Sequence, residues 1–353
     1  MPKDNESVFP LMMNDEPSVP TPAPFAPEQM VRCDECLRAN PPTRVNCLYC
    51  ATALPLTEAT AKLQRPSLRP LEKWEQGYNN IVLPSAANAP AGLSDAALRE
   101  AAELLRLSPE ALTTILSALV PLPLARSATR QEAELVERRL ENLGVHTTLF
   151  VEGLPDNAET VPVKVRSLEM DETQLFAFQT PDAPALEIPW SEVVLLVVGR
   201  LIVKRIEWQE EVARAENRIL DTNEFTTDET VVECYRRRQA GPLRIAANSF
   251  DFSCLGAEKG LVAGENLATV VRLLRKHAPL AHYDDTFNSV RRALDAVWPA
   301  ERQSAASGWR RERPGKYSVG SVSELSNEMQ FRRYSQLRHH LLQENRPGSN
   351  DQD

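Results

Sequence analysis

The strongest constraint in the sequence is a paired cysteine motif near the N-terminus. Four of the six cysteines form a C-x2-C-x10-C-x2-C array: Cys33, Cys36, Cys47 and Cys50. Each pair places two sulfur atoms on one tight turn, and two such turns supply four thiolates that bind Zn²⁺ tetrahedrally at about 2.3 Å. Because four protein ligands fill the coordination shell, the motif predicts a structural zinc site and not a catalytic one. We therefore expect residues 30–56 to form a zinc ribbon that needs its metal to fold.

Two other interpretations of these cysteines are open. CxxC pairs also occur by chance, and a single pair can serve as a redox dithiol when it lies beside a βαβ unit. Disulfide bonds are not expected, because Lys3 is followed by acidic and proline-rich sequence where a secretory signal would carry an apolar stretch. We expect a cytoplasmic protein with reduced thiols, in which the two pairs hold zinc.

The residues around the cysteines resemble the short zinc-ribbon modules found at the N-termini of many uncharacterised bacterial proteins. The resemblance depends on the two CxxC pairs, on the turn at Asn40-Pro41 and on Leu54-Pro55 after the second pair. It implies that all four cysteines are metal ligands, and it implies no particular biological role. The sequence departs from the family pattern at Leu37 and Ala51, which stand where glycine usually follows each pair.

Proline-rich segments divide the rest of the chain. Residues 1–29 are acidic and proline-rich and predict a disordered tail, residues 57–93 predict a linker, and residues 346–353 predict a second tail. Residues 94–153 show helical spacing and then a strand–helix–strand pattern, which predicts a small α+β module of the split βαβ type. Residues 96–151 resemble the C-terminal domain of the ribosomal stalk protein in the run from Pro121 to Val151, and this implies only a compact fold.

Residues 161–279 alternate with the period of β-strands. Seven candidate strands, with separate ones at 193–207, 218–225 and 230–236, precede an amphipathic helix and predict a β-rich barrel closed by that helix. The strand number, the stretch from Ile188 to Val193 and the closing helix resemble bacterial pleckstrin-homology-like domains. That resemblance implies a binding or assembly platform without catalysis. The expected fold class is thus a multi-module α+β protein with a helical C-terminal part.

The C-terminal region, residues 284–345, is predicted to be basic and mainly helical, with a strand at Tyr317–Val322 before its last helix. Residues 286–346 contain eleven lysines and arginines against six acidic residues, in a chain whose net charge is −9. Arginines interleaved with aromatic residues suit single-stranded nucleic acid, through phosphate neutralisation and base stacking. They would equally suit an acidic protein partner, or the acidic groups of the chain itself. The candidate binding residues are Trp309, Arg310, Arg311, Arg313, Lys316, Arg332 and Arg333.

The sequence contains none of the usual local motifs for phosphate loops, nucleophile elbows or zinc proteases. Cys234 or Cys254 could act as a nucleophile only beside a group that lowers its pKa, and we favour inert buried thiols. Residues 256–260 could cradle an anion, and Asp284-Asp285 could bind a cation. We favour the interpretation that residues 256–260 are a loop that connects a strand to a helix, and that Asp284-Asp285 cap a helix.

These observations predict a non-enzymatic, zinc-binding adaptor or scaffold that recognises another protein. We expect no membrane span, because no run approaches the roughly 20 apolar residues that a bilayer requires, and no small-molecule substrate is evident. The alternative function is a nucleic-acid-binding regulator that uses the ribbon and the basic region. A hydrolase or transferase would need titratable groups from different modules to converge in one cleft.

Overall fold

The computed structural model divides the chain into two compact units, Met1–Arg65 and Pro66–Asp353. The structure describes residues 25–55, 57, 60, 63–72, 75–153, 161–213, 217–237, 241–313 and 316–344. Within these ranges, residues 209–213, 217–221, 306–313 and 316–321 are described by their backbone alone. The predicted tail from residue 1 to 29 falls outside the described part up to residue 24, and so does the tail at 346–353. Each unit is taken by itself below.

The first unit is a minimal hairpin built around its cysteines. A short 3-10 turn, η1 (Pro27–Gln29), precedes β1 (Val31–Arg32), which pairs antiparallel with β2 (Ala39–Asn40). Its buried apolar cluster consists of Cys33, Cys47 and Leu54. A core of this size does not supply the several kcal/mol of stability that a domain needs. We therefore expect the folding of this unit to depend on a ligand of its cysteine sulfur atoms.

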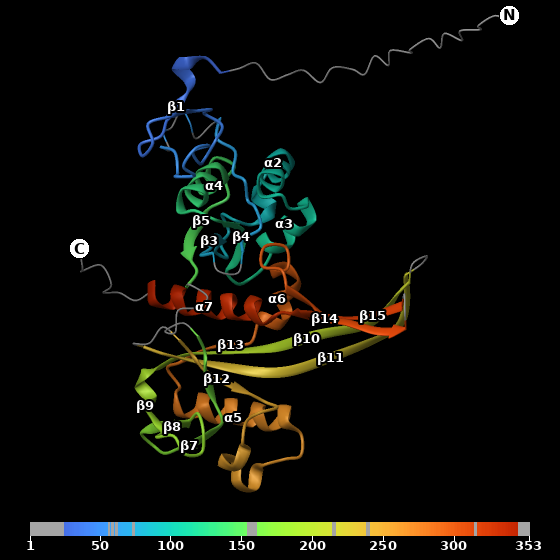
Figure 1. Ribbon diagram of the computed structural model, residues 1–353. Helices are drawn as coiled ribbons and strands as arrows, with labels where there is room; N and C mark the ends of the chain where they lie inside the picture. The colour runs from blue at the N-terminus through green and yellow to red at the C-terminus, as the bar shows by residue number, and fades with distance from the viewer. Residues whose placement is uncertain are drawn as a thin grey trace, which may run out of the picture. The chain divides into compact units, whose positions relative to one another are not determined.

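The N-terminal part of the second unit is a three-stranded sheet with helices packed on it (Figure 1). Its strands are β3 (Tyr78–Val82), β4 (Leu122–Ser127) and β5 (Thr147–Val151), in the antiparallel order β4-β3-β5. The helices are α2 (Asp95–Leu105), α3 (Pro109–Leu116) and α4 (Arg130–Asn142), and η2 (Pro90–Gly92) leads into α2. Each helix begins where a hydroxyl accepts a backbone N–H of the first turn: Ser94, Ser108 and Thr129.

The central strand of this sheet lies in the segment that the sequence predicts to be a linker. The sequence Tyr-Asn-Asn at the start of β3 does not predict a strand, because two consecutive asparagines break the alternation of apolar and polar residues. Both are fully buried, and both amide nitrogens are paired: the Asn80 side chain donates to the Ala133 carbonyl at 3.0 Å, and the Asn79 side chain donates to Glu152 at 3.0 Å. Among the described residues, the Asn80 Oδ1 atom has no hydrogen-bond partner. Hydrogen bonding therefore lets this polar sequence occupy the centre of a sheet.

A second, larger sheet runs through the middle of the unit. Its strand order is β14-β15-β10-β11-β12-β6, and β13 pairs parallel with β10. Figure 1 shows β10, β11, β14 and β15 extending together beyond the covering helices. The bounds are β6 (Val163–Val165), β10 (Val193–Ala213), β11 (Asn217–Arg236), β12 (Leu243–Ala246), β13 (His282–Asp284), β14 (Glu301–Arg313) and β15 (Lys316–Ser326).

The C-terminal region combines a β-hairpin with two helices, so it holds one strand more, β14, than the sequence predicts. The helices α6 (Phe287–Leu294) and α7 (Glu328–Glu344) flank the hairpin β14–β15, which pairs from Glu301↔Ser326 to Arg313↔Lys316. The first strand of this hairpin is hard to recognise, because arginine, serine and alanine replace the alternating apolar residues of a half-buried strand.

The predicted barrel is not closed among the described strands. A separate three-stranded sheet, β7 (Ser167–Met170), β8 (Gln174–Phe178) and β9 (Leu186–Pro189), shares an apolar core with the large sheet and α5 (Ala263–His277). The 3-10 segments η3 (Trp190–Glu192) and η4 (Phe252–Glu258) complete this part. Residues 218–225 and 230–236 form one strand, because residues 226–229 continue the pairing with β10 and do not turn. Because the far part of β10 pairs with β11 on one side and with β15 on the other, the long strands extend the sheet and do not curl into a barrel.

Candidate metal centre

The four cysteine sulfurs come together at one point in the first unit. All four Sγ atoms lie within 4.8 Å of one another. Two distances of 3.5 Å join the separate pairs, Cys33 Sγ to Cys50 Sγ and Cys36 Sγ to Cys47 Sγ. A tetrahedron of sulfur atoms at about 2.3 Å from zinc has edges of roughly 3.8 Å. The sulfur cluster therefore fits a single tetrahedrally bound metal ion.

The two cysteine pairs adopt the same backbone conformation. Leu37 N donates to Cys33 O at 2.9 Å, and Cys33 N donates to Arg38 O at 3.0 Å. In the second pair, Ala51 N donates to Cys47 O at 3.1 Å, and Cys47 N donates to Thr52 O at 2.8 Å. These repeated bonds form two knuckles that hold their sulfur atoms on the same side of the turn.

Leu37 and Ala51 occupy the left-handed backbone region that each knuckle requires. Their φ angles are 58° and 60°, and the positions are the two at which the sequence departs from the glycines of the resembling modules. A residue with a Cβ adopts this conformation at a cost of roughly 1–2 kcal/mol. The departure from the family pattern therefore leaves the knuckle geometry intact and adds local strain.

Asn40 connects the two knuckles. Its side chain is fully buried, accepts from Leu48 N at 2.8 Å, and donates to Arg38 O at 2.9 Å and to Cys47 Sγ at 3.4 Å. A single amide thus fixes the second knuckle against the first and donates to one of the sulfur ligands. The sequence signal for this role is the Asn-Pro turn between the cysteine pairs.

The protein environment shifts the pKa values of individual thiols in opposite directions. Burial raises the pKa of Cys47, but the backbone N–H groups of Tyr49 and Cys50 and the Asn40 amide outweigh it and lower that pKa to about 6. At Cys36 the backbone N–H of Arg38 lowers the pKa of the thiol. Burial and the neighbouring thiols raise it more strongly, so the pKa of Cys36 is raised to about 12. Donors directed at a sulfur favour its thiolate, which is the form that binds metal.

The other predicted chemical groups are not activated. Burial raises the pKa of Cys234 to about 12, and burial also raises the pKa of Cys254. Asp284 is buried, where it accepts from Thr286 N at 2.9 Å and from the Tyr334 hydroxyl at 2.9 Å and pairs with Arg338. Each group therefore has a structural environment that disfavours the chemistry considered for it.

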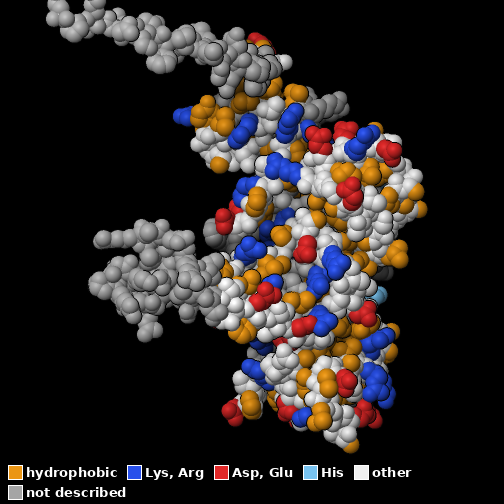
Figure 2. All heavy atoms as spheres, turned by 90° about the vertical axis from the view of Figure 1, so that its right-hand side faces the viewer, with side chains coloured by type: hydrophobic (Ala, Val, Ile, Leu, Met, Phe, Trp, Pro, Cys, Tyr) orange, Lys and Arg blue, Asp and Glu red, His pale blue; other side chains and the backbone are white. Residues whose placement is uncertain are grey.

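The structure describes the side chains of two of the seven candidate binding residues in the basic C-terminal region. Arg333 is buried on α7 and binds Glu152 at 3.3 Å, and Arg332 is half-buried. The remaining five residues lie in β14 and β15, and their side chains fall outside the described part: Trp309, Arg310, Arg311, Arg313 and Lys316. On the face shown in Figure 2, the coloured basic and acidic side chains are interspersed and form no continuous basic stripe.

A feature that the sequence does not reveal is the exposure of apolar side chains at the knuckle tips. Leu37, Leu48 and Tyr49 are 66 %, 54 % and 56 % exposed. The guanidinium of Arg38 lies 4.7 Å from the centre of the Tyr49 ring. We refer to these four residues as the knuckle surface.

Comparison of the chain with family models, with curated proteins and with solved structures finds no match. Of the helices that the structure describes, none is both long and apolar enough to cross a bilayer.

Proposed function

We propose that this chain is a non-enzymatic adaptor or scaffold that holds a structural zinc ion and recognises another protein through its knuckle surface. The observation that carries the proposal is the convergence of four sulfur atoms on one point. Four thiolates complete a tetrahedral shell, so a metal held there has no position for a substrate. When bound, the ion ties the two knuckles together and stabilises the first unit.

The knuckle surface supports recognition of a protein. Large apolar side chains that protrude from a module of this size cannot contribute to its core, and contiguous exposed apolar groups mark interaction sites. Tyrosine and arginine are also the residue types that dominate binding energy at protein interfaces. The contact between Arg38 and Tyr49 orders both side chains before a partner arrives, which reduces the entropy lost on binding.

We also propose that residues 161–279 serve as a platform for assembly and that the protein works in the cytoplasm. The support for the platform is its two sheets that share a core with α5. The support for the location is the cluster of four cysteines, because thiols that bind a metal must be reduced and reduced thiols persist in that compartment.

The test is affinity capture with the full-length protein after zinc content has been measured. Wild type is compared with a Leu48→Ser, Tyr49→Ser variant, and a Leu119→Ser variant is the control because Leu119 is 91 % exposed and lies in the other unit. We expect a partner that wild type and the control retain and that the knuckle variant loses while keeping one equivalent of zinc. Equal recovery of every bound protein by all three forms would contradict the proposal.

A further inference from the structure

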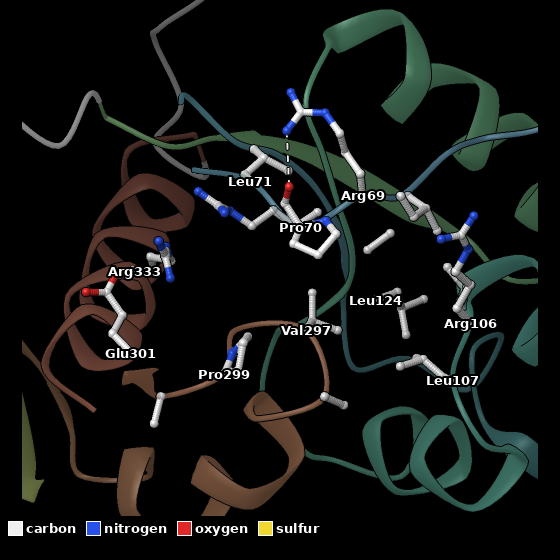
Figure 3. Close-up of a pocket in the computed structure, with 16 residues that line it drawn as sticks. Arg69, Pro70, Leu71, Arg106, Leu107, Leu124, Val297, Pro299, Glu301 and Arg333 are labelled. Carbon is white, nitrogen blue, oxygen red and sulfur yellow. Dashed lines mark hydrogen bonds between the residues drawn. The ribbon is translucent and has the colours of Figure 1, made fainter. Parts of the chain in front are cut away.

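A pocket in the second unit combines apolar walls with arginine side chains. Its volume is about 380 Å³, within the range of small-molecule sites. The segment before β3, the end of α2, strand β4, the connection after α6 and α7 all contribute to it. Figure 3 shows Arg106 beside Leu107 and Leu124 on one side, with Arg333 and Glu301 on the opposite side.

Two residues with a left-handed backbone line this pocket. Of the described residues, four that are not glycine have a positive φ, and two of them are Leu37 and Ala51 of the knuckles. The other two are Leu68, at 38°, and Arg106, at 56°, and both line the pocket. The conformation of Arg106 is the left-handed cap that ends α2, and Leu68 adds a second residue with a costly backbone conformation to the pocket wall.

Interactions from outside the pocket hold both strained residues in place. The buried carboxylate of Glu132 on α4 accepts from Leu68 N at 2.9 Å and from Ser67 Oγ at 2.9 Å. Arg106 is the C-cap of α2, where its N–H bonds to the carbonyls of Ala102 and Glu103. The pocket walls are therefore fixed before any ligand binds, as in built binding sites.

The arginines of the pocket differ in whether they are already paired. Arg126 binds Glu152 through two bonds of 2.7 and 2.8 Å, and Arg333 binds the same carboxylate. Arg69 pairs with Glu75. Among the residues that the structure describes, no acidic side chain pairs with Arg106, which is exposed at the rim. Of the four arginines that line the pocket, Arg106 is the one for which the described part of the chain shows no carboxylate partner.

We infer that this pocket binds a small organic monoanion with an apolar body. The apolar body packs against the partly exposed side chains of Leu68, Leu107 and Val297, and the carboxylate of the ligand binds the Arg106 guanidinium. A charge-assisted bond of this kind provides orientation, whereas burial of the apolar body provides most of the affinity. The inference goes beyond the proposed function, because the pocket uses no residue of the first unit.

The first test measures binding of three probes to the full-length protein by calorimetry. Decanoate carries both features of the ligand, decan-1-ol only the apolar body, and acetate only the charge. We expect decanoate to bind about tenfold more tightly than decan-1-ol, and acetate not to bind at millimolar concentration. Arg106→Gln is expected to weaken decanoate about tenfold and leave decan-1-ol unchanged. Arg99→Gln, an exposed change on the same helix, is expected to alter neither.

A second variant tests the cavity independently of charge. Val297→Phe fills the pocket and is expected to reduce the affinities for decanoate and decan-1-ol more than tenfold, whereas Leu119→Phe, on the exposed surface, preserves both. Thermal unfolding of each variant establishes that it is folded, and the Arg106→Gln comparison stands if Val297→Phe does not fold. Equal affinity for decanoate and decan-1-ol, or equal effects of Arg106→Gln and Arg99→Gln, would overturn the inference.

Discussion

Gly199 on β10 lies directly against the ring of Phe331 on α7. A Cβ atom built on Gly199 would stand 2.5 Å from Phe331 Cδ2, closer than carbon atoms can approach. The absence of a side chain at this position lets the last helix rest on the central strand of the large sheet, and Phe331 is fully buried in the core formed there.

Gly199→Ala should therefore destabilise the second unit by about 2 kcal/mol, because overpacking forces the ring or the helix to move. The free energy of unfolding in urea measures the effect. Gly264→Ala on α5 is the control, since nothing lies within 4 Å of its Cβ position, and it should be neutral or slightly stabilising. Combining Gly199→Ala with Phe331→Leu should restore part of the lost free energy of unfolding. If it restores none, the contact with Phe331 is not the cause of the destabilisation.

Cys47→Ser should abolish stoichiometric zinc binding, because it removes one of four ligands and the thiol that its surroundings acidify most strongly. Elemental analysis of the purified protein gives the readout, with one equivalent expected in wild type. Cys254→Ser removes a half-buried thiol outside the sulfur cluster and should retain the full equivalent. Metal-free wild type would refute the site.

Ala51→Gly should strengthen zinc binding about two- to fivefold. Glycine adopts the φ of 60° at this position without the Cβ penalty, although its greater freedom in the unfolded chain offsets part of the gain. Competition with a chromogenic chelator measures the affinity. Ala53→Gly, two residues away in ordinary backbone, should weaken binding, and an identical response of the two variants would show that strain at Ala51 is unimportant.

Glu152→Gln should destabilise the second unit by about 3 kcal/mol at pH 7, because it leaves Arg126 and Arg333 without their shared carboxylate. Burial raises the pKa of Glu152, but the two guanidiniums and the Asn79 amide outweigh it and the pKa is lowered. The pKa of Glu152 is thus lower in the folded state than in the unfolded state, where it is about 4.3. Its ion pairs therefore stabilise the fold fully above the unfolded-state pKa, and this stabilisation is lost as the pH falls through the folded-state pKa. The difference between wild type and Glu152→Gln in urea denaturation should thus shrink below about pH 4.

The metal ligands could be predicted from the sequence because cysteine spacing encodes their geometry directly. The partner of those ligands, Asn40, is visible only as a turn residue until its buried amide is seen between the knuckles. The strand β3 escapes prediction for a different reason: its two asparagine side chains donate to residues 53 and 73 positions away, which no local pattern records.

The pocket is likewise invisible in the sequence. Its walls come from segments between Leu68 and Arg333, and Arg106 looks like an ordinary exposed residue near the end of a helix. Its left-handed backbone, and the fact that no acidic side chain in the described ranges pairs with it, are properties of the folded chain. For strand β14 the sequence indicates the wrong secondary structure. Its arginines are typical of a basic helix, whereas its backbone pairs with β15.

The hydrogen bond of 2.8 Å from the Trp298 indole to Asn79 spans 219 positions of the chain. During synthesis at about 5–20 residues per second, the central strand of the first sheet waits roughly 10–40 s for that indole to emerge from the ribosome. The Asn79 Oδ1 atom that accepts this bond remains solvated or unpaired throughout this interval, and α7 begins a further 30 residues after Trp298. Premature termination before Trp298 therefore yields a polypeptide without its closing contacts, and such a product is a natural target for chaperones and proteases.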